Sequence, residues 1–306
     1  MTTNISATGA AGVAGRARGR RRSFLMAPAD NADLLRKQAS SGADACIICI
    51  EDAVLPERKA EGRRIAAEAL NSHAYGDKER FIRINGPDTE FWLDDLEYFT
   101  KHSPPTGFII TKVKTPEDVR VVARVLQTLE IRNNLPVGGI LLSAYIETAE
   151  AMRNVYEIAA AHPRMANLHF GAEDYTHSIG ATRTPQQLET LYAMSRVVSA
   201  ARASGLEPIN VMHIVVHDME GLRASSEYSK QLGFTGRTCP TPRHIPVLHE
   251  VFSPSAEEVA YAKEVVAGYR DAQKRGAGVY MVGDGMIDGP MIWKAMRVLD
   301  RADVAY

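Results

Sequence analysis

Cysteine is scarce in this sequence, which narrows the class of protein. Only Cys46, Cys49 and Cys239 occur among 306 residues. A sparse, odd-numbered set argues against a disulfide framework and favours a reducing compartment, so we predict a cytoplasmic protein. Cys46 and Cys49 form a CxxC spacing, but they lie in the apolar run ACIICI, where strand residues three apart point to opposite faces. We interpret them as small buried side chains rather than as a redox or zinc pair.

The sequence also lacks long apolar runs and a large net charge. No apolar run approaches the roughly 18 residues of a membrane span. The formal net charge is -1, so no global field would draw the chain to nucleic acid or to a membrane. Residues 1–21 are rich in small residues, end in basic ones and lack the apolar stretch of a signal peptide. We predict a flexible N-terminal tail there and regard a targeting or phosphate-binding role as the less favoured alternative.

From residue 23 onwards, short apolar runs alternate with longer amphipathic segments. The longer segments carry apolar residues at spacings of three and four, as in VRVVARVL, which is typical of one face of a helix. Gly42, Gly205 and Gly233 follow three of these segments, as expected of helix ends. Eight short runs are candidate strands: SFLMAP (23–28), ACIICIED (45–52), RFIRIN (80–85), GFIITKV (107–113), GGILLSAYIE (138–147), ANLHFGAED (166–174), PINVMHIV (208–215) and GRTCPT (236–241).

Eight strands alternating with helices predict an α/β fold, a (β/α)8 TIM barrel over residues 22–252. An open doubly wound sheet is the alternative, but the glycine-rich fingerprint of its dinucleotide-binding members is absent after the first run. From residue 253 the alternation stops. A capping box, Ser255 with Glu258, begins a long helix, and a glycine-rich, loop-like segment and a final helix follow it. We predict a C-terminal helical extension over residues 253–306, acting as a lid or an oligomer arm.

Acidic residues stand at the ends of several predicted strands. Glu147 ends one run, Asp174 ends the next, and Glu51 and Asp52 end the second. The carboxyl ends of barrel strands meet at one mouth, where unpaired carboxylates would repel one another unless a cation bound them. With no His or Cys cluster, oxygen ligands suit Mg²⁺, or Mn²⁺, better than Zn²⁺. We predict Glu147 and Asp174 as ligands; the alternative is that each caps the helix that follows it.

Basic residues also occur at these strand ends. Arg83 lies in RFIRING, and its guanidinium has the geometry to grip a carboxylate or to stabilise an enolate oxygen. The alternative for Arg83 is an ion pair with Glu51 or Asp52, and the two roles are compatible. Lys112 and His213 also stand at strand ends, but the pattern alone assigns them no catalytic role.

The chain resembles the citrate lyase β-subunit-like (CitE-like) family of the HpcH/HpaI aldolase superfamily, which includes malyl-CoA, β-methylmalyl-CoA and citramalyl-CoA lyases. The matching segments span roughly residues 22–297 and include ACIICIEDAV, RIN, IET, FGAEDYTHSIGATRT, GLRASSEYSKQLGFTG, FSPSAEEVAYAKEV and GxMIDGPM. The resemblance implies a TIM barrel whose C-terminal extension reaches a neighbouring subunit in a homotrimer or hexamer.

The resemblance also implies roles for the residues at the mouth. Glu147, in IET, and Asp174, in FGAED, would be the Mg²⁺ ligands. Arg83, in RIN, would contact the carboxylate or the thioester enolate of the substrate. Glu51 and Asp52, in EDAV, would support the metal-bound waters and Arg83.

Other matched positions lie outside the mouth, and two segments depart from the family pattern. Asp288, in MID, would be the acid/base supplied by an adjacent subunit, and Lys59 and Arg22 would approach the phosphates of CoA. The chain has Pro240, Thr241 and Pro242 where many relatives have Ile-His-Pro, and Asn210 where many have aspartate.

The implied reaction is Mg²⁺-dependent carbon–carbon cleavage or formation in a 3-hydroxy-dicarboxyl-CoA thioester, such as malyl-, citramalyl- or citryl-CoA. Its other products or substrates are an acyl-CoA and a 2-keto acid. The alternatives are an acyl-CoA thioesterase and a citrate lyase β-type subunit that acts on the thioester of a carrier-protein partner.

Overall fold

The computed structural model describes residues 21–72 and 74–305, which form two compact units that meet at Leu248 and His249. This boundary falls inside helix α10 (Ile245–Phe252), a little before the predicted one. Residues 1–20 of the predicted tail lie outside the described residues. Arg21, the last residue of that tail, is only 6% exposed and forms ion pairs with Glu79 and Glu207.

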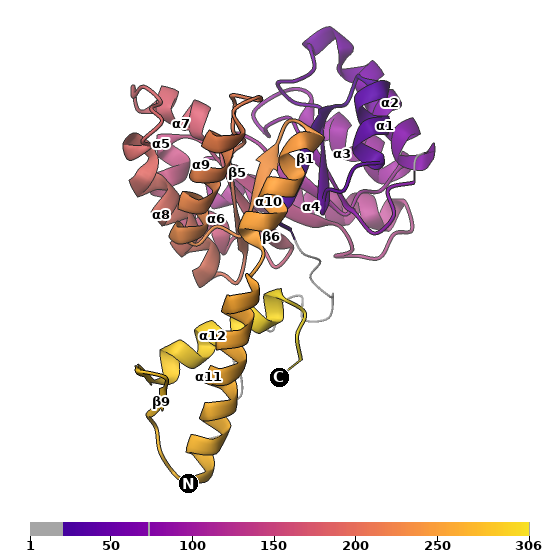
Figure 1. Ribbon diagram of the computed structural model, residues 1–306. Coiled ribbons are helices and arrows are strands. Elements are labelled where there is room, and N and C mark those ends of the chain that lie inside the picture. The colour runs from indigo at the N-terminus through magenta and orange to yellow at the C-terminus, as the bar shows by residue number, and fades with distance from the viewer. Residues whose placement is uncertain (1–20, 73, 306) are drawn as a thin grey trace. The chain divides into compact units, whose positions relative to one another are not determined.

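The first unit is built around a closed barrel of eight parallel strands within the described residues, so the predicted TIM barrel is confirmed (Figure 1). Neighbouring strands follow the order of the chain, and β1 closes the barrel by pairing with β8. Every predicted strand is present: β1 (Ser23–Pro28), β2 (Ala45–Cys49), β3 (Glu79–Ile84), β4 (Gly107–Ile110), β5 (Leu141–Ile146), β6 (Met165–Phe170), β7 (Glu207–Asn210) and β8 (Gly236–Cys239).

Helices cover the outside of the strands (Figure 1). They are α1 (Ala32–Ala39), η1 (Pro56–Arg58), α2 (Lys59–Ser72), α3 (Trp92–His102), α4 (Pro116–Arg132), α5 (Ala149–Arg153), α6 (Val155–Ala159), α7 (Ala172–Ser178), α8 (Leu188–Ala203), α9 (Met219–Leu232) and η2 (Pro242–His244). No helix in the described part of the chain is both long and apolar enough to cross a membrane.

Local sequence explains where these helices begin and end. A capping box of Thr115 and Asp118 starts α4, and Gly233, at φ 105°, ends α9 in the left-handed region that favours glycine. The helical segment after β5 is broken at Asn154 into α5 and α6. Asn154 donates its side-chain amide to the carbonyl of Lys114, which holds the break against the start of α4.

The barrel interior is apolar at one level and contains aromatic rings. Phe24, Phe81 and Tyr145 belong to a buried cluster inside the barrel. His169 of β6 joins them, with its ring stacked 5.1 Å from Tyr145 and edge-on to Phe24 at the same distance. All three cysteines are free and buried, which confirms the interpretation of the CxxC pair as small core side chains.

The second unit has its own small core. Its helix α11 (Ala256–Lys274) begins at the predicted capping box, in which Ser255 and Glu258 exchange hydrogen bonds of 2.8 and 3.0 Å. A helix α12 (Gly289–Arg301) packs against α11. The glycine-rich segment between them was predicted as a loop, which is wrong. It forms an antiparallel hairpin of β9 (Tyr280–Val282) and β10 (Gly285–Ile287).

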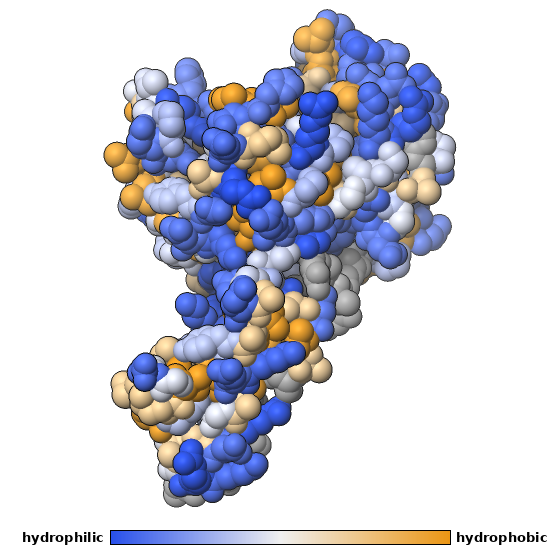
Figure 2. Space-filling model, in the orientation of Figure 1, coloured by the Kyte–Doolittle hydropathy of each residue, from blue (hydrophilic) through white to orange (hydrophobic). Residues whose placement is uncertain are grey.

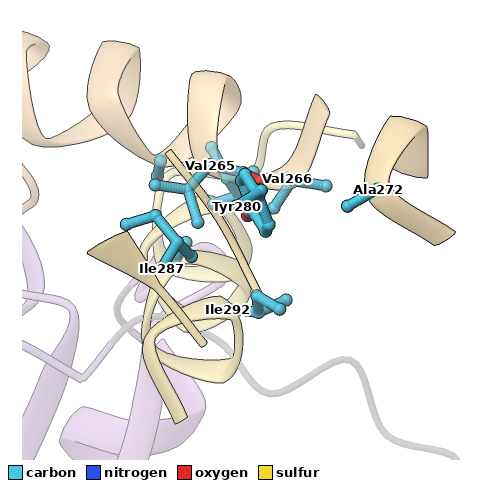
Figure 3. Close-up of a cluster of buried hydrophobic side chains, with 9 residues drawn as sticks. Val265, Val266, Ala272, Tyr280, Ile287 and Ile292 are labelled. Atoms are coloured by element: carbon cyan, nitrogen blue, oxygen red, sulfur yellow. The ribbon is translucent and has the colours of Figure 1, made fainter. Parts of the chain in front are cut away.

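The hairpin exists because both of its strands contribute to that core. Tyr280 of β9 and Ile287 of β10 point toward Val265 on α11 and Ile292 on α12 (Figure 3). The Tyr280 hydroxyl also donates to the backbone carbonyl of Val265. Three-residue strands are too short to show an alternating pattern, so periodicity alone does not reveal them.

Candidate active site

The predicted acidic residues lie at the carboxyl ends of neighbouring strands. Glu51 follows β2, Arg83 is on β3, Glu147 follows β5, and Asp174 lies in the first turn of α7 after β6. Because all strands are parallel in a closed barrel, these ends share one rim, where TIM-barrel enzymes carry their active sites. We call this set of residues, with Asp52 and Lys112, the acidic rim.

Lys112 connects the carboxylates of the acidic rim. Its backbone N–H donates to Glu147 Oε1 at 2.7 Å. Its ammonium lies 3.1 Å from Asp174 Oδ1, 3.4 Å from Asp52 Oδ2 and 3.7 Å from Glu51 Oε1. One residue therefore touches every predicted acid of the mouth. Burial alone would lower the pKa of Lys112, but the surrounding carboxylates raise it above its ordinary value.

Lys112 contacts the carboxylates through both its backbone N–H and its ammonium because its backbone is in an unusual conformation. Its φ is 53°, in the left-handed region that a residue with a side chain enters at a cost of about 1–3 kcal/mol. The turn aims the N–H at Glu147 and the ammonium at the other acids. Sequence reasoning placed Lys112 at a strand end but gave it no role; the signal it offered was a lone cation between acidic strand ends.

Glu147 is held in a tight, buried place. It is 1% exposed, and burial raises its pKa to about 7 even though Arg83 and Lys112 favour the charged form. A Cβ on Gly171 would lie 2.6 Å from Glu147 Cβ and 2.9 Å from its Oε2, so only glycine leaves room for this carboxylate. Since a buried carboxylate is stable as an anion only next to positive charge, the place favours a cation.

Arg83 is paired and still has a hydrogen-bond donor available. Its Nη2 lies 2.8 Å from Glu51 Oε2, so the predicted ion pair is present. Its guanidinium stacks over the Tyr145 ring at 4.8 Å, and its Nε has no hydrogen-bond partner among the described residues. Burial raises the pKa of Glu51, against the effect of Arg83. The ion pair thus fixes the Arg83 cation, and the Nε donor of Arg83 stays unused within the described residues.

The capping alternative for the two predicted ligands is wrong. The Thr148 hydroxyl accepts from the N–H of Ala151 and caps α5, and Gly171 is the N-cap of α7, so neither Glu147 nor Asp174 caps a helix. Within residues 21–72 and 74–305, no group of three or more His, Cys, Asp or Glu side chains could hold a metal. Two carboxylates fit Mg²⁺, which usually completes its coordination with water and substrate.

Three further predicted residues are not members of the acidic rim. Lys59 borders it, because its ammonium donates to the backbone carbonyl of Glu51 at 3.1 Å. Lys59 is 5% exposed, and its ammonium donates to the carbonyl of Ile50 at 2.8 Å and to Asn85 Oδ1 at 2.7 Å. Arg22 precedes β1, at the opposite end of the barrel, where its guanidinium bonds to Asp44. Their contacts with CoA phosphates stay a prediction. Asp288 belongs to the second unit, where it caps α12.

The fold and the acidic rim define the class: a TIM barrel with a metal-type carboxylate mouth. Residues 22–242 match the family model described as HpcH/HpaI aldolase/citrate lyase. Citrate lyase subunit beta of Leuconostoc mesenteroides subsp. cremoris is 32% identical over 92% of this chain and 93% of that protein. The (3S)-malyl-CoA thioesterase of Cereibacter sphaeroides is 33% identical over 92% and 94%. This chain belongs to the HpcH/HpaI aldolase/citrate lyase family.

Solved structures agree with this assignment. CitE from Mycobacterium tuberculosis, in complex with magnesium, acetoacetate and coenzyme A, is 26% identical with a TM-score of 0.75. The match covers 92% of this chain and 98% of that one. A citrate lyase from Burkholderia xenovorans LB400 has a TM-score of 0.83 over 93% of each chain; at 19% identity this likeness shows the fold.

Proposed function

We propose that this chain is a Mg²⁺-dependent carbon–carbon lyase. It would cleave or form a 3-hydroxy-dicarboxyl-CoA-type thioester and give an acyl-CoA and a 2-keto acid. The observation that carries the proposal is the convergence of Glu147, Asp174 and the Arg83–Glu51 pair around Lys112. The Mycobacterium tuberculosis relative, whose structure contains magnesium, acetoacetate and coenzyme A, supports this choice of ligands.

Each residue of the acidic rim would have a distinct task. Glu147 and Asp174 would hold Mg²⁺, or Mn²⁺ in its place. The bound ion supplies Lewis-acid stabilisation for oxygen charge on the keto acid. Arg83, with its spare Nε donor, would orient the thioester and stabilise its enolate oxygen. Glu51 would hold Arg83 in place, and Asp52 would orient water at the exposed edge of the rim.

Asp288 would move the proton at the thioester α-carbon. We propose that it reaches the rim of a neighbouring subunit in a homotrimer or hexamer. Large apolar side chains on the same unit are exposed, among them Met281 at 61%, Met286 at 63% and Trp293 at 59%. Hydrophobic residues are visible on the surface of this unit (Figure 2). Exposed apolar residues gathered on a unit of this size support a protein–protein contact surface.

Mixed oligomers would test this arrangement of subunits. Asp174→Asn and Asp288→Asn variants should each be inactive, and mixing them by unfolding and refolding together should restore part of the activity. Restoration requires sites that combine an intact rim from one chain with an intact Asp288 from another. No restoration in oligomers shown by mass spectrometry to be mixed would contradict a shared site.

Two alternative reactions keep specific support. The Cereibacter sphaeroides relative is a thioesterase, so the same rim would then direct water at the thioester carbonyl. The citrate lyase beta subunits suggest a thioester on a carrier-protein partner instead of free CoA. We also propose a cytoplasmic location, which the free cysteines support, and we assign no nucleic-acid or membrane partner.

A substrate panel separates these reactions. The protein with Mg²⁺ would be incubated with malyl-, citramalyl-, β-methylmalyl- and citryl-CoA, and keto acid and free CoA would be followed separately by mass spectrometry. Keto acid together with a shorter acyl-CoA establishes the lyase. Free CoA with intact hydroxy acid establishes the thioesterase. No turnover of any CoA ester, with Mg²⁺ binding intact, would contradict both and favour the carrier-protein substrate.

A further inference from the structure

A cavity of about 480 Å³ lies beside α9, and none of its lining residues belongs to the acidic rim. The loop 183–187 after α7, the loop residues 213–215, one side of α9 and Arg237 of β8 line it. We call it the α9 pocket. Its volume falls within the range of roughly 300–1,000 Å³ that small-molecule sites occupy.

Arg237 is the most unusual residue of the α9 pocket. It is 1% exposed, and its Nε donates to the carbonyl of Val211 at 2.6 Å. Its Nη1 donates to the hydroxyls of Ser225 and Ser226 at 2.7 and 3.0 Å. Within the described residues no carboxylate pairs with Arg237. A buried guanidinium without a counter-ion is unfavourable, and burial together with Arg183 lowers the pKa of Arg237 to about 10.

Two buried nitrogens in the pocket wall have no hydrogen-bond partner among the described residues. Arg183 Nε has no hydrogen-bond partner in the described chain, and the nearest carboxylate oxygen that pairs with it, on Glu189, is 4.0 Å away. His213 Nε2 likewise has none, and it lies 3.5 Å from Asp218 Oδ2. Since native proteins pair nearly all of their buried polar atoms, these two nitrogens, next to the buried guanidinium of Arg237, indicate a ligand with acceptor oxygens.

The charges around the pocket indicate a monoanion. Arg183 already pairs with Glu173, at 2.6 Å between Nη1 and Oε1. Asp218, the only acid that lines the cavity among the described residues, caps α9 by accepting from the N–H of Gly221 at 2.8 Å. The guanidinium of Arg237 therefore remains as one unmatched positive charge.

Part of the wall is apolar, beside the polar residues Thr184, Gln186 and Gln187. Pro185, Ile214, Val215, Ala224 and Tyr228 line it, and Ile214 and Val215 are each 56% exposed. We propose that the α9 pocket binds a small organic carboxylate, with its carboxylate on Arg237 and Arg183 and its carbon chain against this apolar wall. The planar fork of arginine matches the two oxygens of a carboxylate.

Binding of butyrate to the full-length protein, measured by titration calorimetry in EDTA, tests this. The probes are butyrate, its neutral isostere butyramide, and inorganic phosphate. Butyrate should bind at least tenfold more tightly than butyramide, and more tightly than phosphate. Equal binding of butyrate and butyramide would overturn the proposal, and tighter binding of phosphate would overturn the choice of a carboxylate. EDTA removes metal ions, so the acidic rim does not contribute through them.

A pair of matched variants locates the binding. Val215→Asp supplies a carboxylate from the wall itself, so it should weaken butyrate binding at least tenfold and raise the unfolding temperature. Val137→Asp makes the same change at a valine that is 55% exposed and lies outside the pocket, and it should bind butyrate like the unmodified protein. Arg183→Gln should weaken binding several-fold. Unchanged binding in Val215→Asp, or equal loss in Val137→Asp, would overturn the location.

Discussion

The acidic rim and the α9 pocket lie in the same barrel unit and leave charge of opposite sign unmatched. At the rim, four carboxylates surround two cations, Arg83 and Lys112. In the pocket, Arg183 pairs with Glu173 and Asp218 caps α9, so the buried guanidinium of Arg237 is left without a counter-ion among the described residues. Because unmatched charge inside a protein is unfavourable, its sign indicates the sign of the ligand that relieves it. The rim thus favours binding of a metal ion, and the pocket favours binding of an oxyanion.

Asp174→Asn should have the largest effect, because it removes one of two proposed metal ligands. Mg²⁺-dependent turnover should fall by about 1,000-fold or more, as expected when several kcal/mol of charge stabilisation are lost. Mn²⁺ binding, followed by electron paramagnetic resonance, should disappear while the circular dichroism spectrum is kept. Glu173→Gln, one residue earlier, is the control and should keep the metal. Full Mg²⁺-dependent activity in Asp174→Asn would contradict the ligand assignment.

His169→Phe tests the aromatic cluster inside the barrel, where burial disfavours a charged side chain. Burial lowers the pKa of His169 to about 3, so the folded protein keeps this ring neutral. Its contribution is fully present above the unfolded pKa of about 6.5 and is lost as pH falls toward 3. Between pH 7.5 and 5 the free energy of unfolding should fall by about 2 kcal/mol through this residue alone.

His169→Phe should flatten that part of the pH dependence, because a phenyl ring fits the same aromatic contacts without titrating. Urea unfolding at pH 7.5, 6 and 5 measures it. The exposed His177, replaced by Phe in the same way, should leave the slope as it is. An unchanged slope in His169→Phe would show that another group is responsible.

Lys112→Met tests how the rim balances its own charge. The substitution removes the ammonium among the carboxylates but keeps the backbone N–H that bonds Glu147. Mg²⁺ binding should tighten by about tenfold, because the ion no longer competes with a cation a few ångströms away. The unfolding temperature without metal should fall. Lys114→Met, at a lysine that pairs with Asp88 at 2.7 Å, should change neither quantity. Weaker metal binding in Lys112→Met would mean that the ammonium supports the ligands.

The smallest effect should come from Glu173→Gln, which removes the ion-pair partner of Arg183 in the wall of the α9 pocket. Glu173 is largely exposed, so losing its ion pair with Arg183 should change the free energy of unfolding by less than about 0.5 kcal/mol. The freed Arg183 should nevertheless tighten butyrate binding by two- to threefold in calorimetry. Weaker butyrate binding in this variant would show that Glu173 holds Arg183 in its binding position.

Sequence patterns predicted most of the barrel because its information is local. The strands of a buried parallel sheet are continuous apolar runs, and helices repeat with their own period, so each element is visible in a short window. The strand ends followed from the same pattern. Glu147 and Asp174 could therefore be assigned to one mouth without any knowledge of distances.

Features that depend on distant residues were not predictable in this way. Lys112 acquires its contacts from a left-handed turn and from strands that are far apart in the sequence. Arg237 looks like an ordinary residue of the short run GRTC, and its lack of a counter-ion emerges only when α9 and the neighbouring loops are in place. Arg21, the last residue of the predicted tail, is buried because it pairs with Glu79 and Glu207, which begin β3 and β7.

Gly171 carries a consequence for how this protein tolerates change. Its missing side chain is space already used by Glu147, so even one added methyl group would displace that carboxylate. In a library of all single substitutions, position 171 should therefore accept only glycine for function, while residues such as Val137 accept nearly anything. The strictest demand on this barrel then falls on a residue that has no chemistry of its own.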